Sequence, residues 1–355
     1  MDWILTLIAY IIAVPLVVLP LRVFFINRAR KKVSAACEIS EVREFMLGGY
    51  LQKVLLEGKS RNNPVLIFLH GGPGSPLPFN VGCRGLLPEM TDKHLMIIWD
   101  QLGSGINNYP MTDSFAMEDL VEMTVDLIRA IRAEFPDNRL ELFGVSCGSF
   151  LAAHAALIVP DLIDRIIIYG QITHQLFTSP DVYAALAEPL VPAKVRAEIA
   201  AIEAKGPDSY EAKDIAEIAR ALRRNTEAYL VRDGVKSPRR ASKVVLDLML
   251  GMAFSPDYRL RDAFALVRNG YRENTSIILG VVAADLRPVL EQVPLPYVII
   301  QGEKDLVTST LLVEEFMATA QNPHLTLRVV PDSAHYPGDA AIRELLSLRG
   351  ENGDS

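Results

Sequence analysis

The chain reads Leu140-Glu141-Leu142-Phe143-Gly144-Val145-Ser146-Cys147-Gly148 at the point from which its architecture can be inferred. The mostly apolar residues 140–143 predict a strand, and the G-x-S-x-G sequence predicts a sharp turn into a helix that starts near Ser149. Glycine is needed at positions 144 and 148 because the strand and helix backbones pass too close for a Cβ atom. The strained turn presents the Ser146 hydroxyl beside a helix N-terminus, which favours negative charge. We therefore expect Ser146 to attack a carbonyl carbon; the alternative is a serine that only caps the helix.

Length and composition exclude several classes of protein. The 355 residues suffice for one large domain with an insertion, or for two domains, and half of them are hydrophobic. The net charge of −7 combines both signs along the whole chain, so nucleic acid is not an expected partner. The three cysteines, Cys37, Cys83 and Cys147, lack the spacing of metal ligands and suggest no dependence on disulfides. No metal site is predicted.

The N-terminal segment differs from the rest of the chain. Residues 3–21 contain no charged side chain, and nineteen residues are enough to cross a bilayer as a helix. Five basic residues follow within residues 22–32, whereas a secretory signal peptide carries its positive charge in front. We therefore predict a single-pass membrane anchor with the catalytic domain in the cytoplasm. The alternatives are a buried helix or an amphipathic helix that lies on the membrane surface.

Apolar segments alternate with helical segments along most of the chain. The sequence predicts helices at residues 114–135 and 149–158 and a hairpin at residues 44–56. Continuous apolar strands are predicted at residues 65–69, 94–99, 140–143, 163–169, 296–300 and 325–330. Such strands between helices are typical of a mostly parallel sheet with helices on both faces. The predicted fold class is α/β.

The strand pattern is interrupted by a long segment that is mostly helical and more charged. It covers residues 177–286 and is expected to form a cap, or lid, over an active site; a second domain unrelated to the site is the alternative. The predicted organisation is an anchor with its basic flank (1–32), two parts of one core (33–176 and 287–350), the cap between them, and a disordered tail (351–355).

A nucleophilic serine needs a base and an acid that orients the base. Asp305 directly follows the predicted strand at 296–300, and His335 directly follows the strand at 325–330. The carboxyl ends of parallel strands gather at one edge of a sheet, so these side chains can converge on Ser146. Glu303 competes with Asp305 for the acid role, whereas Asp332 shares a tight turn with the histidine and is a poor acid. A surface position for His335 is the alternative.

Acyl transfer also needs backbone N–H groups that face the oxygen on which charge develops. One is expected from Cys147, which follows the nucleophile. The other is expected from the loop after the strand at 65–69, where Gly72 is the first choice and Gly71 the second. The residues expected to shape and support these loops are His70, Pro73, Gly74, Gly144 and Gly148.

Three motifs together resemble one known family. They are His70-Gly71-Gly72-Pro73-Gly74, Asp100-Gln101-Leu102-Gly103-Ser104-Gly105, and the elbow around Ser146. This set is similar to the proline iminopeptidase group of the α/β-hydrolases, peptidase family S33, over residues 45–345 apart from the cap. The resemblance implies an α/β-hydrolase core with a helical cap, no metal and no organic cofactor. By motif position it implies Ser146 as nucleophile, Asp305 as acid and His335 as base.

The chain also departs from that family. Cys147 stands where the family has a tryptophan, Leu102 stands where it has an arginine, and the cap lacks the W-x-x-W-E motif. In the family, cap glutamates bind the free amine of the substrate, and no single glutamate is indicated here. The glutamates available in the cap are Glu188, Glu198, Glu203, Glu211, Glu217 and Glu227.

These observations predict a membrane-anchored serine hydrolase that cleaves a peptide, amide or ester bond through an acyl-enzyme. The resemblance makes a proline iminopeptidase acting on a small molecule or short peptide the first expectation. An esterase or lipase-type enzyme acting on a membrane-proximal acyl substrate is the alternative, and a non-catalytic binding protein is a third hypothesis. We also expect Cys147 to be thiol-sensitive, because a helix N-terminus lowers a thiol pKa. The substrate and the oligomeric state stay open.

Overall fold

The structure is a computed structural model, and it places most of the chain. The described residues are 16–28, 30–31, 35–76, 88–112, 114–230, 250, 252–255, 257–259, 261–262, 271, 274–337 and 339–348. The predicted disordered tail, 351–355, lies outside them.

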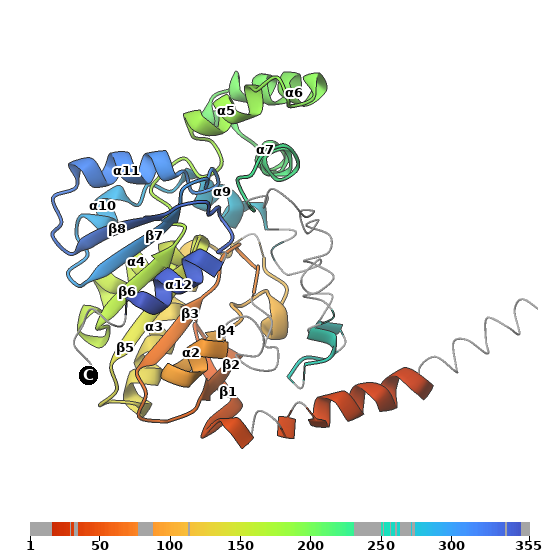
Figure 1. The fold of residues 1–355 in the computed structure, drawn as a ribbon, viewed down its shortest axis with the longest axis vertical. Coiled ribbons are helices and arrows are strands. Elements are labelled where there is room, and N and C mark those ends of the chain that lie inside the picture. Colours follow the sequence, from red (N-terminus) through yellow and green to blue (C-terminus); the bar gives the residue numbers. More distant parts are fainter. Residues whose placement is uncertain are drawn as a thin grey trace, which may run out of the picture.

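The described strands form one eight-stranded sheet in the order β1-β2-β4-β3-β5-β6-β7-β8 (Figure 1). Their bounds are Ile39–Leu47 (β1), Tyr50–Gly58 (β2), Val65–Leu69 (β3), Leu95–Trp99 (β4), Leu140–Val145 (β5), Arg165–Tyr169 (β6), Tyr297–Gly302 (β7) and Leu325–Val330 (β8). β2 pairs antiparallel with β1 and β4, and all other neighbours are parallel. The predicted mostly parallel sheet is confirmed, and the N-terminal hairpin is longer than expected.

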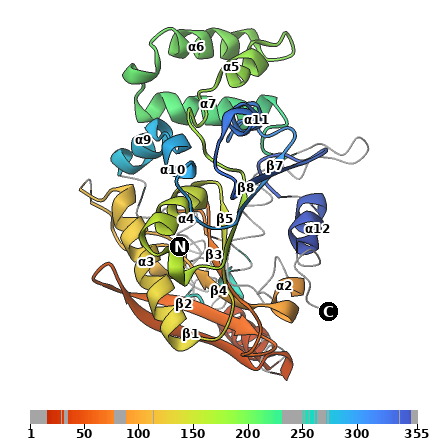
Figure 2. The same cartoon turned by 90° about the vertical axis from the view of Figure 1, so that its left-hand side faces the viewer.

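The central strands are buried on both faces, which explains their unbroken apolar sequences. In β3, Val65, Ile67 and Leu69 belong to the core that includes α3 and α4. Leu66 and Phe68 belong to a second core with residues of α2 and α12. Because successive side chains of a strand point to opposite faces, one five-residue strand contributes to both layers. Figure 2 shows these helices on the two sides of the sheet.

Helices flank the sheet and also occur among the described residues between β6 and β7. Their bounds are Pro88–Lys93 (α2), Met117–Glu134 (α3), Cys147–Ile158 (α4), Pro180–Ala187 (α5), Ala193–Glu203 (α6), Ala212–Asn225 (α7), Thr275–Ala283 (α9), Arg287–Leu290 (α10), Thr310–Thr319 (α11) and Asp339–Ser347 (α12). Short 3-10 turns occupy Gly105–Asn107, Pro160–Leu162 and Pro207–Ser209.

The helices α5, α6 and α7 form a separate group at one end of the molecule (Figures 1 and 2). α7 buries Ile215, Ile218 and Leu222, which lie on one face because they are three and four residues apart. Each such buried side chain stabilises the packed state by about 1.5–3 kcal/mol relative to exposure. The described residues of 177–286 contain no strand, and their regular elements are helices.

An N-terminal helix over residues 16–28 lies at the opposite end of the long axis from α5–α7 (Figure 1). Arg22 fastens it to the domain, because the guanidinium donates to the carbonyl oxygens of Ala253 (2.7 Å) and Tyr258 (2.8 Å). Of the helices that the structure describes, none has the length and apolar character needed to cross a bilayer. The larger part of the predicted span 3–21 falls in residues 1–15, outside the described residues, so the anchor stays a prediction.

Candidate active site

The turn at Ser146 connects β5 to α4 with a strained backbone. Ser146 has φ 52° and ψ −116°, a positive φ that residues with a side chain rarely adopt. A Cβ atom at Gly148 would lie 2.1 Å from the Leu69 carbonyl oxygen, and one at Gly144 would lie 2.9 Å from the Gly148 carbonyl oxygen. Both glycines are therefore required by close backbone approach. The helix begins at Cys147 and not near Ser149, so the turn is tighter than the sequence predicted.

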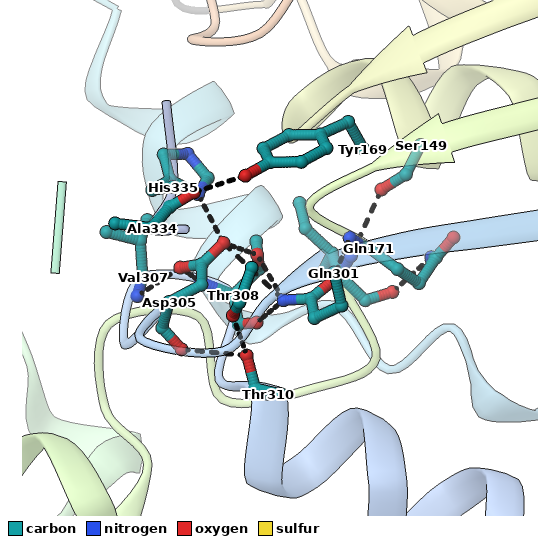
Figure 3. A network of polar contacts seen from close by, with 12 residues as sticks. Ser149, Tyr169, Gln171, Gln301, Asp305, Val307, Thr308, Thr310, Ala334 and His335 are labelled. Atoms are coloured by element: carbon teal, nitrogen blue, oxygen red, sulfur yellow. Dashed lines mark hydrogen bonds and ion pairs between the residues drawn. The ribbon is translucent and has the colours of Figure 1, made fainter. Parts of the chain in front are cut away.

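Asp305 and His335 meet at the carboxyl ends of β7 and β8 (Figure 3). His335 Nδ1 lies 2.8 Å from Asp305 Oδ2, and both side chains are buried. A carboxylate accepts, so the Nδ1 atom carries the proton in this pair and the Nε2 atom presents its lone pair. Glu303, the rival acid, instead accepts the backbone N–H of Asp332 at 3.0 Å.

The Asp305 carboxylate is held by several further donors (Figure 3). Its Oδ1 atom accepts the backbone N–H groups of Val307 (2.8 Å) and Thr308 (3.0 Å), and its Oδ2 atom accepts the Thr308 hydroxyl (2.8 Å). The carboxylate therefore has one orientation, and that orientation fixes the His335 ring. The sequence analysis missed Thr308, although its position three residues after an aspartate is a usable signal for such a turn.

Ser146 and His335 occupy neighbouring positions without a recorded hydrogen bond between the hydroxyl and the ring. The Ser146 N–H donates to the Tyr169 carbonyl oxygen at 2.9 Å. A Cβ atom on the next residue, Gly170, would lie 3.4 Å from both Cε1 and Nδ1 of His335. The imidazole thus packs against the backbone that holds the serine. Hydrogen bonds between catalytic groups are often long or misaligned without a substrate and tighten when it binds.

The glycine loop after β3 passes directly beside Ser146. A Cβ atom at Gly71 would lie 3.1 Å from Ser146 Cβ and 3.1 Å from the Val145 carbonyl oxygen. Gly72 has φ 127°, and a Cβ atom there would lie 2.5 Å from the Gly74 nitrogen, because the loop folds back on itself. Gly71, the second choice from the sequence, is therefore the glycine that touches the serine. Cys147 opens α4, so its N–H has no partner within the helix.

His70 connects this loop to the loop after β4. The Gln101 N–H donates to His70 Nε2 at 3.0 Å, so Nδ1 carries the proton and donates to the Gly71 carbonyl oxygen at 2.8 Å. Burial lowers the pKa of His70 to about 4, so the ring is neutral at pH 7. Gln101 Nε2 also donates to the His70 carbonyl oxygen at 2.9 Å. Both ring nitrogens of His70 are engaged with backbone groups, so this side chain links two backbone segments.

A buried acid in the second motif escaped the sequence analysis. Asp100 Oδ2 accepts the Tyr258 hydroxyl at 2.7 Å and the Ile106 N–H at 2.8 Å. Burial raises the pKa of Asp100 to about 7. Gly105 is required here, because a Cβ atom on it would lie 1.8 Å from Asp100 Oδ2. Asp100 therefore ties its own loop to a residue of the segment 177–286.

The expectation that Cys147 is a reactive thiol is wrong. Its side chain is 2% exposed, and burial raises the pKa of the thiol to about 12. The cost of placing a thiolate in an apolar environment exceeds the favourable effect of the helix N-terminus.

Four of the six cap glutamates named above already have cationic neighbours. Their partners are Lys194 for Glu198, Lys213 for Glu211, Arg220 for Glu217 and Lys304 for Glu227. Within the described parts of the chain, no group of three or more His, Cys, Asp or Glu side chains is suited to a metal ion.

A family model described as "alpha/beta hydrolase fold" matches residues 64–339. The chain belongs to the α/β-hydrolase family. It is 34% identical over 131 residues to the "Probable aminopeptidase YbaC" of Bacillus subtilis (strain 168). That match covers 35% of this chain and 39% of the relative, so the chain spans about two fifths of the curated relative.

Solved structures of hydrolases share the fold of this α/β-hydrolase. A membrane phospholipase A matches with a TM-score of 0.58 and 17% identity, over 99% of this chain and 100% of the other. A proline iminopeptidase from Mycobacterium smegmatis matches with a TM-score of 0.53 and 21% identity, over 88% and 95%. Identities this low establish the fold and not the substrate. The family match and these neighbours establish the α/β-hydrolase fold of this chain.

Proposed function

We propose that this α/β-hydrolase is a serine hydrolase that cleaves a peptide, amide or ester bond through an acyl-enzyme. The observation that carries the proposal is the 2.8 Å contact between His335 Nδ1 and Asp305 Oδ2, next to the backbone that holds Ser146. This contact directs the basic Nε2 atom of His335 away from the carboxylate. A buried, oriented imidazole beside an elbow serine has the parts needed for nucleophilic catalysis.

In this mechanism the Ser146 hydroxyl oxygen attacks the substrate carbonyl carbon while His335 Nε2 accepts the hydroxyl proton. The Cys147 N–H, with an N–H from Gly71 or Gly72, stabilises the oxyanion. The leaving amine or alcohol takes the proton from His335, and Ser146 keeps the acyl group as an ester. A water molecule then gives a proton to His335 Nε2 and attacks the ester carbonyl carbon. The bond to the Ser146 oxygen breaks, His335 returns the proton to that oxygen, and the acid is released.

For the substrate, we propose the aminopeptidase-like reading first, with a short peptide or small amide as substrate. The aminopeptidase-named relative and the three motifs support it. The pairing of four cap glutamates with cations weakens it, because a cap carboxylate must be available for the amine of the substrate.

A membrane-proximal acyl ester is the second candidate, and the N-terminal helix favours it. Large apolar side chains of that helix are exposed; they are Leu16, Val17, Val18, Leu19, Leu21, Val23, Phe24 and Phe25. Exposed apolar surface of this extent needs a partner, and a bilayer next to a basic flank fits it. We therefore keep the single-pass anchor and a cytoplasmic catalytic domain as proposals. Membrane fractionation of the full chain and of a variant without residues 1–32 tests them.

Labelling with a fluorophosphonate probe tests the mechanism directly. We expect the wild-type chain to be labelled at Ser146 and the Ser146→Ala variant to remain unlabelled. A folded wild-type chain that never reacts would favour the non-catalytic hypothesis. Comparison of a proline arylamide with short and long acyl esters then separates the two substrate classes.

A further inference from the structure

The loop that carries His335 is held from two sides. On its N-terminal side the core holds it, because Ser333 O accepts the Lys304 N–H at 2.8 Å and Ala334 O accepts the Tyr169 hydroxyl. On its C-terminal side the partners come from the segment that follows α7. The His335 N–H donates to the Ala228 carbonyl oxygen, and the Tyr336 N–H donates to the Tyr229 carbonyl oxygen, both at 3.0 Å. We call residues 227–229 the strap.

The Tyr229 side chain also contacts the catalytic ring. Its ring meets the His335 ring edge-on, with centroids 5.8 Å apart and planes at 85°. The Arg223 guanidinium carbon of α7 lies 4.9 Å from the Tyr229 ring centroid, a cation–π arrangement. The side chain is buried, and burial raises the pKa of Tyr229 to about 12, so it stays neutral. Tyr229 therefore bridges a cap helix and the imidazole.

Ion pairs of Lys304 also connect the strap to the loop that carries His335. Lys304 Nζ lies 3.2 Å from Glu227 Oε2 of the strap and 3.4 Å from Asp332 Oδ1 of the His335 loop. The Glu227 hydrogen bond raises the pKa of Lys304, so its charge is maintained. Partly exposed pairs of this kind contribute little stability. Their effect here is to hold three chain segments in one register beside Asp305.

We propose that the strap is a positioning element for His335, so that the base reaches its catalytic orientation only when the cap is seated. The inference rests on the proposed role of His335 as base. The two backbone N–H groups at His335 and Tyr336 bond to the strap, and the ring packs between Gly170 and Tyr229. If the cap moves away, the strap moves with it, and Asp305 alone then orients the His335 ring.

Tyr229→Ala tests the ring contact, and Tyr229→Phe is its matched control because it keeps the ring. The readouts are the rate of Ser146 labelling by a fluorophosphonate and the low-field NMR resonance of the His335 Nδ1 proton. We expect Tyr229→Ala to slow labelling about tenfold or more and to broaden the resonance, because small misplacements of catalytic groups cost rate steeply. Tyr229→Phe should label within about twofold of wild type, as positioning needs only the ring.

Lys304→Gln tests the bridge in case Tyr229→Ala does not fold. Its control is Lys205→Gln, which removes the ion pair of Lys205 with Asp214 in the cap. We expect Lys304→Gln to slow labelling about threefold, which corresponds to the free energy of one weak ion pair. The control should leave the labelling rate unchanged. A folded Tyr229→Ala chain, or a Lys304→Gln chain, that labels at the wild-type rate with an unaltered resonance overturns the strap. A wild-type chain that never labels overturns the proposed function instead.

Discussion

Gly148→Ala places the new methyl group where the backbones of β3 and α4 are closest. The added Cβ atom would lie 2.1 Å from Leu69 O and 2.9 Å from Leu69 C, whereas real Cβ contacts are essentially never under 3.0 Å. The shortfall of 0.9 Å is against the backbone carbonyl of Leu69, so no side-chain rotation can relieve it. α4 must therefore move away from β3, and it takes Ser146 and the Cys147 N–H with it.

The expected cost appears in both stability and rate. Overpacking of a well-packed core costs about 1–3 kcal/mol, and we expect the free energy of unfolding in urea to fall by this amount. A displacement of about 1 Å at the reacting groups is expected to slow fluorophosphonate labelling of Ser146 about 100-fold.

Gly280→Ala is the matched control. Gly280 lies in α9, and a Cβ atom there has nothing within 4 Å. The same chemical change should therefore be neutral or stabilising by about 0.5–1 kcal/mol, because alanine favours a helix over glycine. The close-approach argument for the turn at Ser146 is refuted if Gly148→Ala has the wild-type free energy of unfolding and labelling rate. It is also refuted if Gly280→Ala lowers both as much as Gly148→Ala does.

Three other outcomes follow from the buried groups of the site. Asp305→Asn removes the charge facing His335 Nδ1 and should slow labelling by about 10³–10⁴-fold; a loss below tenfold would mean that another carboxylate orients the ring. Burial lowers the pKa of His70 to about 4, so between about pH 6.5 and 4 the unfolded chain binds the extra proton and stability falls as pH falls. Burial raises the pKa of Asp100 to about 7, so between about pH 4 and 7 the folded chain binds the extra proton and stability falls as pH rises. These two pH dependences of the free energy of unfolding oppose one another, each at up to about 1.4 kcal/mol per pH unit. At about pH 5–6 the free energy of unfolding in urea should therefore fall with rising pH in His70→Gln. In Asp100→Asn it should fall with falling pH. Parallel curves for wild type and both variants would contradict these pKa shifts. Finally, because burial raises the pKa of Cys147 to about 12, N-ethylmaleimide at pH 8 should modify it only in urea; rapid modification of the native thiol would disprove its burial.

The elbow could be predicted from sequence because its physical cause is local. Gly144 and Gly148 record a close backbone approach that any fold with this turn must contain. Asp305 and His335 could be paired in advance because a topological rule gathers strand ends at one edge of a parallel sheet. Their 2.8 Å contact agrees with that rule. What the sequence could not supply was the exact start of α4, since Ser146 itself occupies the turn.

The strap illustrates what a single sequence leaves hidden. The partners of His335 and Tyr336 are backbone carbonyl oxygens of Ala228 and Tyr229, and every residue type carries a carbonyl. The Cys147 prediction failed for a related reason. Its helix N-terminus is visible in the sequence, whereas the apolar side chains that bury the thiol come from distant parts of the chain.

The residues around Cys147 also explain why the motifs shared with the resembling family indicate the type of reaction better than the substrate. The resembling family has a tryptophan at this position, where this chain has the smaller cysteine. Tyr271 lies near Cys147, and burial together with this neighbour raises the pKa of Tyr271. The Tyr271 hydroxyl donates to the Leu102 carbonyl oxygen. Its ring also lies close to Gly103, where a Cβ atom would approach the Tyr271 Cε2 atom to 2.9 Å. A residue from the segment before α9 therefore packs where both departures from the family motifs occur. The proposed catalytic groups follow strands of the sheet, whereas Tyr271 comes from the segment 177–286, which lacks the W-x-x-W-E motif of the family.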